Sequence, residues 1–358
     1  MYIYIHIPFC SSICSYCDFP KLLYDKKFTR NYLNNIKEEI LSRYKDEEVL
    51  SIYVGGGTPT SLDEEELKYL LNITSIFKKT KDIEFTIETN VESLSIEKIK
   101  LLKEYNVNRI SLGVQSFQDN TLKELNRKHR KNDVFNVINN LKKEGFKNIS
   151  IDYIYGVHPD LEETKKDIKS FLELDIPHIS CYSLIIENNT VFGIKKRNYI
   201  EEDIEEEMYN YIKKTLQDKN YLHYEISNYA KEGYQSLHNL NYWNNGEYYG
   251  FGLGAVSYLN NNRITNTKNL TKYLKKEYIE TTEYEDKKTN ISNTFMLGFR
   301  KTKGINIINF KEKYQIDILN IEPVKRLLNE GKLILEDNQL YIHPNYFYLS
   351  NEIIIEFI

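Results

Sequence analysis

The first 17 residues, MYIYIHIPFCSSICSYC, combine a strand pattern with a cluster of cysteines. Isoleucine occupies every second position from residue 3 to residue 7, which is the period of a β-strand. Cys10, Cys14 and Cys17 follow at once, and the chain of 358 residues has only four cysteines. Disulfide pairing within an odd cluster leaves one thiol over, so the cluster favours metal or redox ligands.

Five more short apolar runs recur along the chain, with helical spacing between them. They are LSIYVGG ending at Gly56, IEFTIET ending at Thr89, RISLGVQ ending at Gln115, NISIDYIYG ending at Gly156 and HISCYSLII from His178. Between Leu67 and Phe77 apolar residues follow a helical period, and Ser61-Leu-Asp-Glu64 before them matches a capping box. This alternation predicts parallel strands in an α/β sheet or barrel.

The pattern changes after Gly193. We expect an acidic helix over EEDIEEEMYNYIKKTLQ, then a stretch rich in glycine, tyrosine and asparagine through Tyr258. The C-terminal residues predict a small helical module, and GKLILEDNQLYIHP near its end predicts a β-hairpin with an Asp-Asn turn. Helix–helix–hairpin resembles a winged helix; we favour a structural cap over a nucleic-acid module. Predicted domains are therefore 1–200, 201–285 and 286–358.

The charge balance argues against a nucleic-acid binder, because the formal net charge is −4 whereas such proteins usually carry a basic excess. No apolar run approaches the ~20 residues that cross a bilayer. The N-terminus also lacks the basic n-region of a signal peptide. We therefore expect a cytoplasmic protein, and in that reducing compartment clustered cysteines are more often ligands than disulfides.

Other chemistry-bearing residues also lie near the ends of predicted strands. They are Gly55-Gly56-Gly57-Thr58-Pro59 after the second strand, Glu88 and Asn90 at the third, Gln115 at the fourth and Asp152 in the fifth. In α/β barrels the loops at this edge converge and build the active site. Three consecutive glycines also indicate a backbone that approaches a ligand closely. We expect these residues to share one site with the cysteines.

Three thiolates suit a cubane iron–sulfur cluster in which one iron has no protein ligand. A structural zinc site would need four protein ligands. His6 is the nearest candidate for the fourth, but it lies on the first predicted strand, where packing also explains it. The spacing therefore favours an open [4Fe–4S] cluster, with zinc as the alternative.

The C-x3-C-x2-C motif with Tyr16, together with the glycine run, resembles the radical S-adenosylmethionine (SAM) proteins. The resemblance implies that Cys10, Cys14 and Cys17 hold a [4Fe–4S] cluster and that SAM chelates the fourth iron. It also implies the fold class: an α/β, partial (β/α)6 TIM-like radical SAM barrel, here with a C-terminal α+β extension and a small winged-helix-like cap.

A closer resemblance rests on HIPFC, CSYCDF, GGGTPT, RISLGVQSF, HISCYSLIIE, YEISNYA and HNLNYW. These motifs are similar to those of the family that contains oxygen-independent coproporphyrinogen III oxidase (HemN) and the heme chaperones (HemW). The resemblance implies one or two bound SAM molecules. By motif match, the first would contact Tyr4, Gly56 and Glu88. The second, or the space it occupies, would contact Tyr16, Gly57, Thr58, Gln115, Arg127 and Asp152.

Two features favour the chaperone branch. Phe19 stands where the oxidases carry a further cysteine, and the first cluster cysteine is already residue 10. The second feature is His238-Asn-Leu-Asn-Tyr-Trp243, which resembles the heme-binding element of the chaperones. There His238 would be an exposed axial ligand of the heme iron, and Tyr242 and Trp243 would offer flat faces to the porphyrin. A packed aromatic cluster with a hydrogen-bonded His238 is the alternative.

The resemblance thus implies a heme chaperone that transfers heme to apo-hemoproteins, with no catalytic residue assigned and no coproporphyrinogen oxidase activity. The alternatives are the oxidase itself and a radical SAM porphyrin methyltransferase. Peripheral contact with a membrane stays open, as does the choice between monomer and homodimer.

Overall fold

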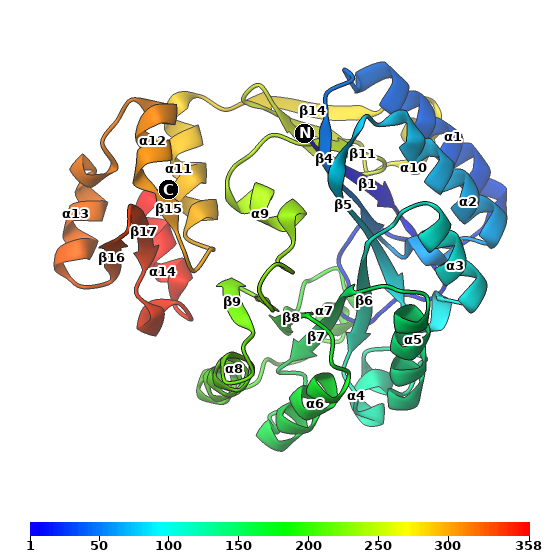
Figure 1. Cartoon of the computed structure of the whole chain (residues 1–358), viewed down its shortest axis with the longest axis horizontal. Helices are drawn as coiled ribbons and strands as arrows, with labels where there is room; N and C mark the ends of the chain where they lie inside the picture. Colours follow the sequence, from blue (N-terminus) through cyan, green and yellow to red (C-terminus); the bar gives the residue numbers. More distant parts are fainter.

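The computed structural model describes residues 1–358, and its largest element is a nine-stranded sheet (Figure 1). The strand order is β11-β1-β4-β5-β6-β7-β8-β10-β9. Its six central strands are mutually parallel: β1 (Tyr2–Ile7), β4 (Val49–Gly56), β5 (Lys79–Asn90), β6 (Arg109–Gln115), β7 (Asn148–Tyr155) and β8 (His178–Ser183). These are the six predicted strands. The α/β class with a parallel sheet is therefore confirmed, and the sheet stays open as a partial barrel.

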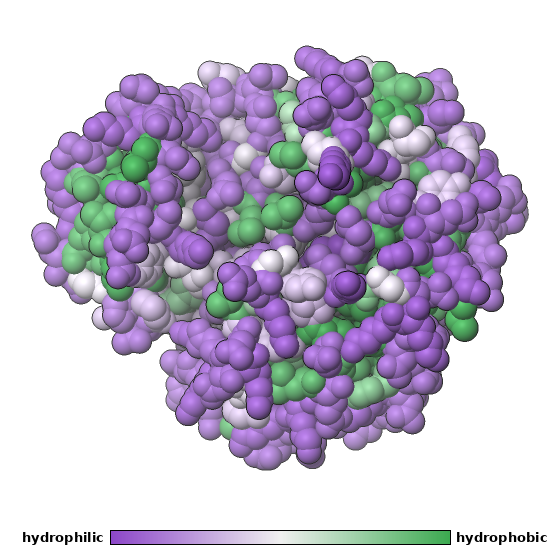
Figure 2. Space-filling model, in the orientation of Figure 1, coloured by the Kyte–Doolittle hydropathy of each residue, from purple (hydrophilic) through white to green (hydrophobic).

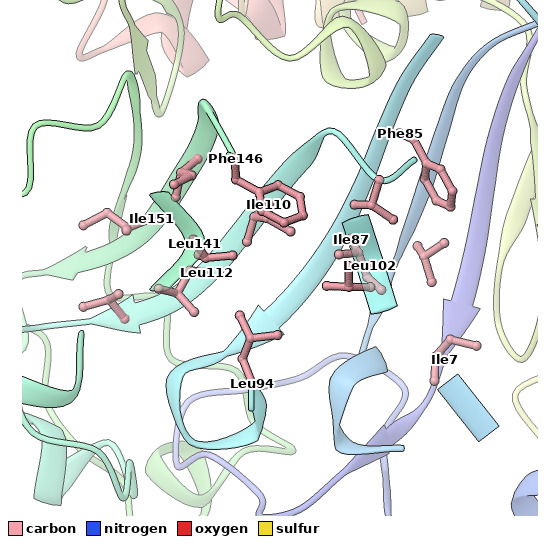
Figure 3. Packing of buried hydrophobic residues seen from close by; sticks show 14 of the residues in the cluster. Ile7, Phe85, Ile87, Leu94, Leu102, Ile110, Leu112, Leu141, Phe146 and Ile151 are labelled. Carbon is pink, nitrogen blue, oxygen red and sulfur yellow. The ribbon is translucent and has the colours of Figure 1, made fainter. Parts of the chain in front are cut away.

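Helices cover the outer face of the curved sheet (Figure 1). They are α1 (Lys26–Arg43), α2 (Glu64–Ile73), α3 (Ile96–Glu104), α4 (Asp119–Glu124), α5 (Lys131–Lys143), α6 (Leu161–Glu173) and α8 (Glu202–Gln217), with the short α7 (Val191–Ile194) near β8. The main apolar core of 53 buried residues fills the space between sheet and helices. Figure 3 shows Leu102 of α3 and Leu141 of α5 among the strand residues Ile87, Ile110 and Leu112. This packing fixes where the strands end, and hence the geometry of the site.

The start of α2 corrects the predicted capping box. The helix begins at Glu64, and its N-cap is Asp63, whose carboxylate accepts from the backbone N–H of Glu66 at 2.9 Å. Ser61 instead ends a 3₁₀ turn and donates to the Phe9 carbonyl at 2.9 Å. An aspartate directly before the helix competes better for the free N–H groups than a serine two residues earlier.

Both edges of the sheet are built by the segment after α8. The strands β9 (Leu222–Glu225) and β10 (Asn228–Ala230) extend the sheet beyond β8, and β10 runs antiparallel to it. The chain then forms α9 (Leu237–Trp243) and returns to the opposite edge as β11 (Tyr249–Phe251), which pairs in parallel with β1. In Figure 1, α9 therefore lies between the barrel and the C-terminal module.

A smaller sheet and the C-terminal module complete the chain. The sheet contains β12 (Val256–Leu259), β13 (Asn262–Asn266) and β14 (Ile279–Tyr284), with α10 (Leu270–Leu274) between the last two. The module contains α11 (Lys287–Gly298), β15 (Ile305–Asn306), α12 (Ile307–Tyr314), α13 (Glu322–Asn329), β16 (Leu333–Glu336), β17 (Gln339–Ile342) and α14 (Ser350–Ile354). Its core of 15 buried residues is separate from the main one. The predicted hairpin is confirmed: Asp337 and Asn338 both have positive φ, as a tight hairpin turn requires. The domain limits at 200 and 285 stay predictions.

The viewed surface is mostly hydrophilic, with apolar residues in separate patches (Figure 2). None of the helices combines the length and the apolar composition needed to span a bilayer.

Candidate cofactor site

Three free thiols line one cavity at the carboxyl end of the parallel sheet. Cys10 belongs to the short strand β2 (Phe9–Cys10), which pairs with β3 (Leu22–Leu23), and Cys14 and Cys17 lie in the loop between them. The cavity has a volume of about 130 Å³. No three His, Cys, Asp or Glu side chains lie close enough together to hold a single metal ion. Three thiols without a fourth protein ligand would suit a cluster with one open iron better than a structural zinc site, which takes four protein ligands.

His6 is not a fourth ligand in this arrangement. Its Nε2 lies 2.9 Å from the Pro20 carbonyl, which can only accept, so Nε2 carries the proton. Its Nδ1 then accepts from the Tyr4 hydroxyl at 2.9 Å. Burial lowers the pKa of His6 to about 4, so the ring is neutral. Tyr4 is engaged with His6 and does not line the cavity, so its predicted contact with SAM stays a prediction.

The glycine run lets the end of β4 approach its neighbours closely. A Cβ atom at Gly55 would lie 2.7 Å from the carboxyl carbon of Glu88, and one at Gly56 would lie 2.4 Å from the His6 ring. Gly56 also has φ +112°, a conformation that side chains rarely allow. In this position its backbone N–H donates to Glu88 at 2.8 Å, and Tyr53 donates to the same carboxylate at 2.7 Å. The run therefore positions Glu88 at the cavity wall.

A chain of hydrogen bonds connects two of the cysteines. Thr58 Oγ1 lies 3.8 Å from Cys10 Sγ and accepts from Asn90 Nδ2 at 2.7 Å. The side-chain oxygen of Asn90, Oδ1, accepts from Arg127 Nη2 at 2.8 Å, and Arg127 Nη1 lies 3.5 Å from Cys14 Sγ. Donors directed at sulfur stabilise its thiolate form and tune a cluster bound to it. The sequence placed Asn90 at a strand end without assigning it a role; here it is the central member of the chain.

Arg127 also pairs with the partly buried carboxylate of Glu92. Glu92 lies 3.2 Å from Arg127 Nη2 and 3.3 Å from His129 Nδ1. The Gly113 carbonyl accepts from the same guanidinium nitrogen at 2.7 Å. Arg127 is 4% exposed, so this network fixes its direction. Arg127 is therefore not a solvent-exposed charge and lines the cysteine cavity.

A second cavity of about 300 Å³ continues the first one along the strand ends. The residues shared by the two walls are Tyr16, Cys17, Glu88, Ser111, Gln115 and Asp152. Burial raises the pKa of Glu88 to about 7 and that of Asp152 to about 6. A cationic ligand beside these two carboxyl groups would lower their pKa again and so favour the ionised form, which accepts hydrogen bonds. The predicted residues Gly56, Gly57, Thr58 and Arg127 line the first cavity as well.

Gln115 and Arg109 mark the two ends of β6. Gln115 is buried, and its backbone has φ +71°, which is uncommon for residues other than glycine. Such strain is frequent at functional sites. Arg109 lines the second cavity, is 2% exposed and has a buried Nε without a partner. Sequence reasoning missed Arg109, although a single arginine in an otherwise apolar strand pattern was a signal.

The residues of the HNLNYW element point to different sides of α9. His238 faces the sheet: its Nδ1 bonds with Ser51 Oγ of β4 at 2.8 Å and its Nε2 with the Tyr242 hydroxyl at 2.9 Å. The expectation of an exposed imidazole is wrong, because His238 is 1% exposed, and burial lowers its pKa to about 3. Trp243 lines a different cavity, next to the C-terminal module. The alternative of a packed aromatic cluster describes the observed His238.

Comparisons with known proteins agree with this geometry. Residues 4–173 match the sequence model of the Radical SAM superfamily. The chain is 39% identical to the heme chaperone HemW of Lactococcus lactis, over 99% of this chain and 96% of that protein. It is 37% identical to the heme chaperone HemW of Bacillus subtilis, over 98% and 97%.

The chain belongs to the HemW family. In structure it is similar to coproporphyrinogen III oxidase (HemN) from Escherichia coli, described as a radical SAM enzyme, with a TM-score of 0.87. The match covers 99% of this chain and 89% of that one, but at 18% identity it shows the fold alone.

Membership of the radical SAM superfamily implies a [4Fe–4S] cluster and SAM in this HemW family member. The residues present fit both groups, since three free thiols and two carboxyl groups share one continuous cavity. A bound cluster would offer one iron without a protein ligand, at which SAM can be chelated. The chain would contribute the thiolates, the donors Thr58 and Arg127 beside the sulfurs, and Glu88 and Asp152 as acceptors.

Proposed function

We propose that this protein binds heme and transfers it to apo-hemoproteins, with a [4Fe–4S] cluster and SAM in the barrel. The observation that carries the proposal is similarity along nearly the whole chain to proteins named heme chaperone HemW. Phe19 supports it against the oxidase, since this side chain is 61% exposed where that branch has a cysteine.

We assign the cluster to Cys10, Cys14 and Cys17. The first SAM is assigned to Tyr4, Gly56 and Glu88, and a second SAM to Tyr16, Gly57, Thr58, Gln115, Arg127 and Asp152. Support comes from the cavity walls, on which all of these residues except Tyr4 lie. Arg127 Nη1 lies 3.5 Å from Cys14 Sγ, so an anionic group of SAM that pairs with it would bind close to this cysteine.

We assign heme contact to α9, through His238, Tyr242 and Trp243. Trp243 faces a cavity in the observed conformation, whereas both ring nitrogens of His238 are engaged. Ligation of iron by His238 therefore requires α9 to move and the hydrogen bonds with Ser51 and Tyr242 to break. Such a step suits reversible binding, which a transfer protein needs.

The test begins with anaerobic reconstitution of the cluster and titration with hemin, followed by mixing with an apo-hemoprotein. We expect a heme absorbance band that moves to the acceptor. His238→Ala should weaken this band, and His343→Ala, which removes an imidazole from the C-terminal module, should leave it unchanged. Absence of hemin binding by the wild type would contradict the proposal. Conversion of coproporphyrinogen III with SAM and a reductant would establish the oxidase instead, and a methylated tetrapyrrole the methyltransferase.

The location and assembly also belong to the proposal. Reduced, clustered thiols suit the cytoplasm. Gel filtration with light scattering distinguishes monomer from homodimer, and flotation with lipid vesicles tests peripheral membrane contact.

A further inference from the structure

A large cleft separates α9 from the C-terminal module. Its volume is about 720 Å³, within the range of small-molecule sites. The apolar part of its wall comes from Leu222, Leu237, Leu240, Ile305 and Phe310, and Trp243 lies beside them. Leu237, Leu240 and Trp243 follow helical spacing on α9, on the face away from His238. The cleft is therefore distinct from the cysteine cavity and from the surroundings of His238.

The charge of the cleft is opposite to that of the whole protein. Its 21 wall residues include Lys301, Lys303 and Lys313 but no aspartate or glutamate. The chain has 52 acidic residues among 358 and a net charge of −4, so about three acidic residues would be expected in a wall of this size by proportion. A cluster of cations without acids attracts an anionic ligand.

None of the three lysines has a carboxylate partner. Lys301 Nζ donates to the side chain of Asn244, Lys313 Nζ lies 3.4 Å from the Asn245 carbonyl, and Lys303 is exposed. Burial lowers the pKa of Lys301 to about 8, so a neighbouring anion would be needed to restore its usual basicity. The indole of Trp243 lies at the same wall, next to the buried carboxyl group of Glu225. The wall thus combines lysines that have no carboxylate partner with an apolar surface.

We propose that this cleft binds the heme by its two propionates, which face Lys301, Lys303 and Lys313 while the macrocycle lies against Trp243 and the leucines of α9. The inference rests on the proposed function and deepens it by naming where the carboxylates bind. A flat apolar ring with two negative charges at one edge matches both properties of the wall. A phosphate ester would satisfy the lysines but leave the apolar residues uncovered.

The experiment compares two ligands and three proteins. The ligands are hemin and hemin dimethyl ester, in which both carboxylates are blocked. The proteins are the wild type, the cleft variant Lys301→Glu/Lys303→Glu/Lys313→Glu, and a control variant Lys37→Glu/Lys81→Glu/Lys100→Glu. The control makes the same charge change at exposed lysines that have no ion pair. Binding is followed by the heme absorbance and by the fluorescence of Trp243, the only tryptophan in the chain.

We expect the cleft variant to bind hemin at least tenfold more weakly than the wild type and the control variant. Wild type should bind the dimethyl ester at least tenfold more weakly than hemin, and the cleft variant should weaken ester binding no further. Circular dichroism and the melting temperature check that the variant is folded. The milder Lys301→Gln/Lys303→Gln/Lys313→Gln variant replaces it if it is not.

Two outcomes would overturn the inference. Equal hemin affinity of wild type and cleft variant would leave heme binding intact but place the propionates elsewhere. Loss of affinity for a DNA duplex in the cleft variant, with hemin binding unchanged, would identify a nucleic-acid surface. Failure of the wild type to bind hemin would instead refute the proposed function, so the two failures are distinguishable.

Discussion

The mouth of the barrel, formed by the two cavities at the carboxyl end of the parallel sheet, and helix α9 both carry residues that the sequence singles out. The two regions arrange these residues differently. At the mouth, residues far apart in sequence, such as Cys10, Glu88 and Asp152, line one continuous cavity. On α9, near neighbours in sequence separate: His238 is buried against β4 and Trp243 faces the cleft. Parallel strands bring their carboxyl ends to one edge, whereas a helix turns successive residues to different sides. A compact motif therefore does not imply a compact site.

The largest expected effect tests whether the two regions are independent. Cys14→Ser should abolish nearly all of the iron and the visible absorbance of the reconstituted cluster, because the third thiolate is lost. Cys181→Ser, at a buried cysteine of β8, should retain the cluster. Hemin binding should stay within about twofold of the wild type, since the cleft lies apart from the cysteines. Loss of hemin binding together with the cluster in Cys14→Ser would show that the two regions are coupled.

The next prediction concerns how α9 is held against the sheet. Glu84 of β5 accepts from the backbone N–H groups of Leu237 at 2.9 Å and His238 at 3.0 Å. Glu84→Ala leaves two donors without a partner, and each loss costs about 1–3 kcal/mol. We expect unfolding free energy to fall by about 3 kcal/mol in urea titration and the amides of α9 to exchange faster. Glu84→Gln, which keeps one acceptor oxygen, should lose less. Unchanged exchange in both variants would contradict this role.

The sequence predicted the mouth better than the cleft, for a physical reason. Alternating residues specify each strand, and the parallel order then brings Gly56, Gln115 and Asp152 together without further information. The cleft wall combines residues from Leu222 to Gln339, so no local pattern describes it. The capping error had a local cause instead, because Asp63 directly precedes the helix and caps it in place of Ser61. Arg109 carried a local signal, as an arginine in an apolar run, but its burial at the wall of the second cavity became visible only in three dimensions.

A third prediction asks whether His238 ever leaves the sheet. Tyr242→Phe removes the hydroxyl that bonds with His238 Nε2 and should cost about 1 kcal/mol of stability. If iron ligation by His238 competes with this hydrogen bond, the variant should bind hemin up to about fivefold more tightly. Tyr248→Phe, which removes a neighbouring hydroxyl without a contact to His238, is the control. An unchanged affinity in Tyr242→Phe would exclude His238 as the ligand and leave the cleft as the heme contact.

The smallest effect is the pH dependence at the mouth. Burial raises the pKa of Glu88 to about 7 from its usual value of 4.5. Between these values the folded protein binds more protons than the unfolded chain, so the contribution of Glu88 to stability is complete below about pH 4.5 and is lost as the pH rises through 7. Glu88 is partly exposed, so the loss should be on the order of 1 kcal/mol. Tyr53 and Gly56 donate to different oxygens of Glu88, so Glu88→Gln keeps an acceptor for only one of them. Because the amide does not titrate, the stability advantage of the wild type over the variant should shrink from pH 5 to pH 7.5. A difference independent of pH would mean that the Glu88 carboxylate stays ionised in the folded protein. Burial at the mouth of the barrel would then not raise its pKa.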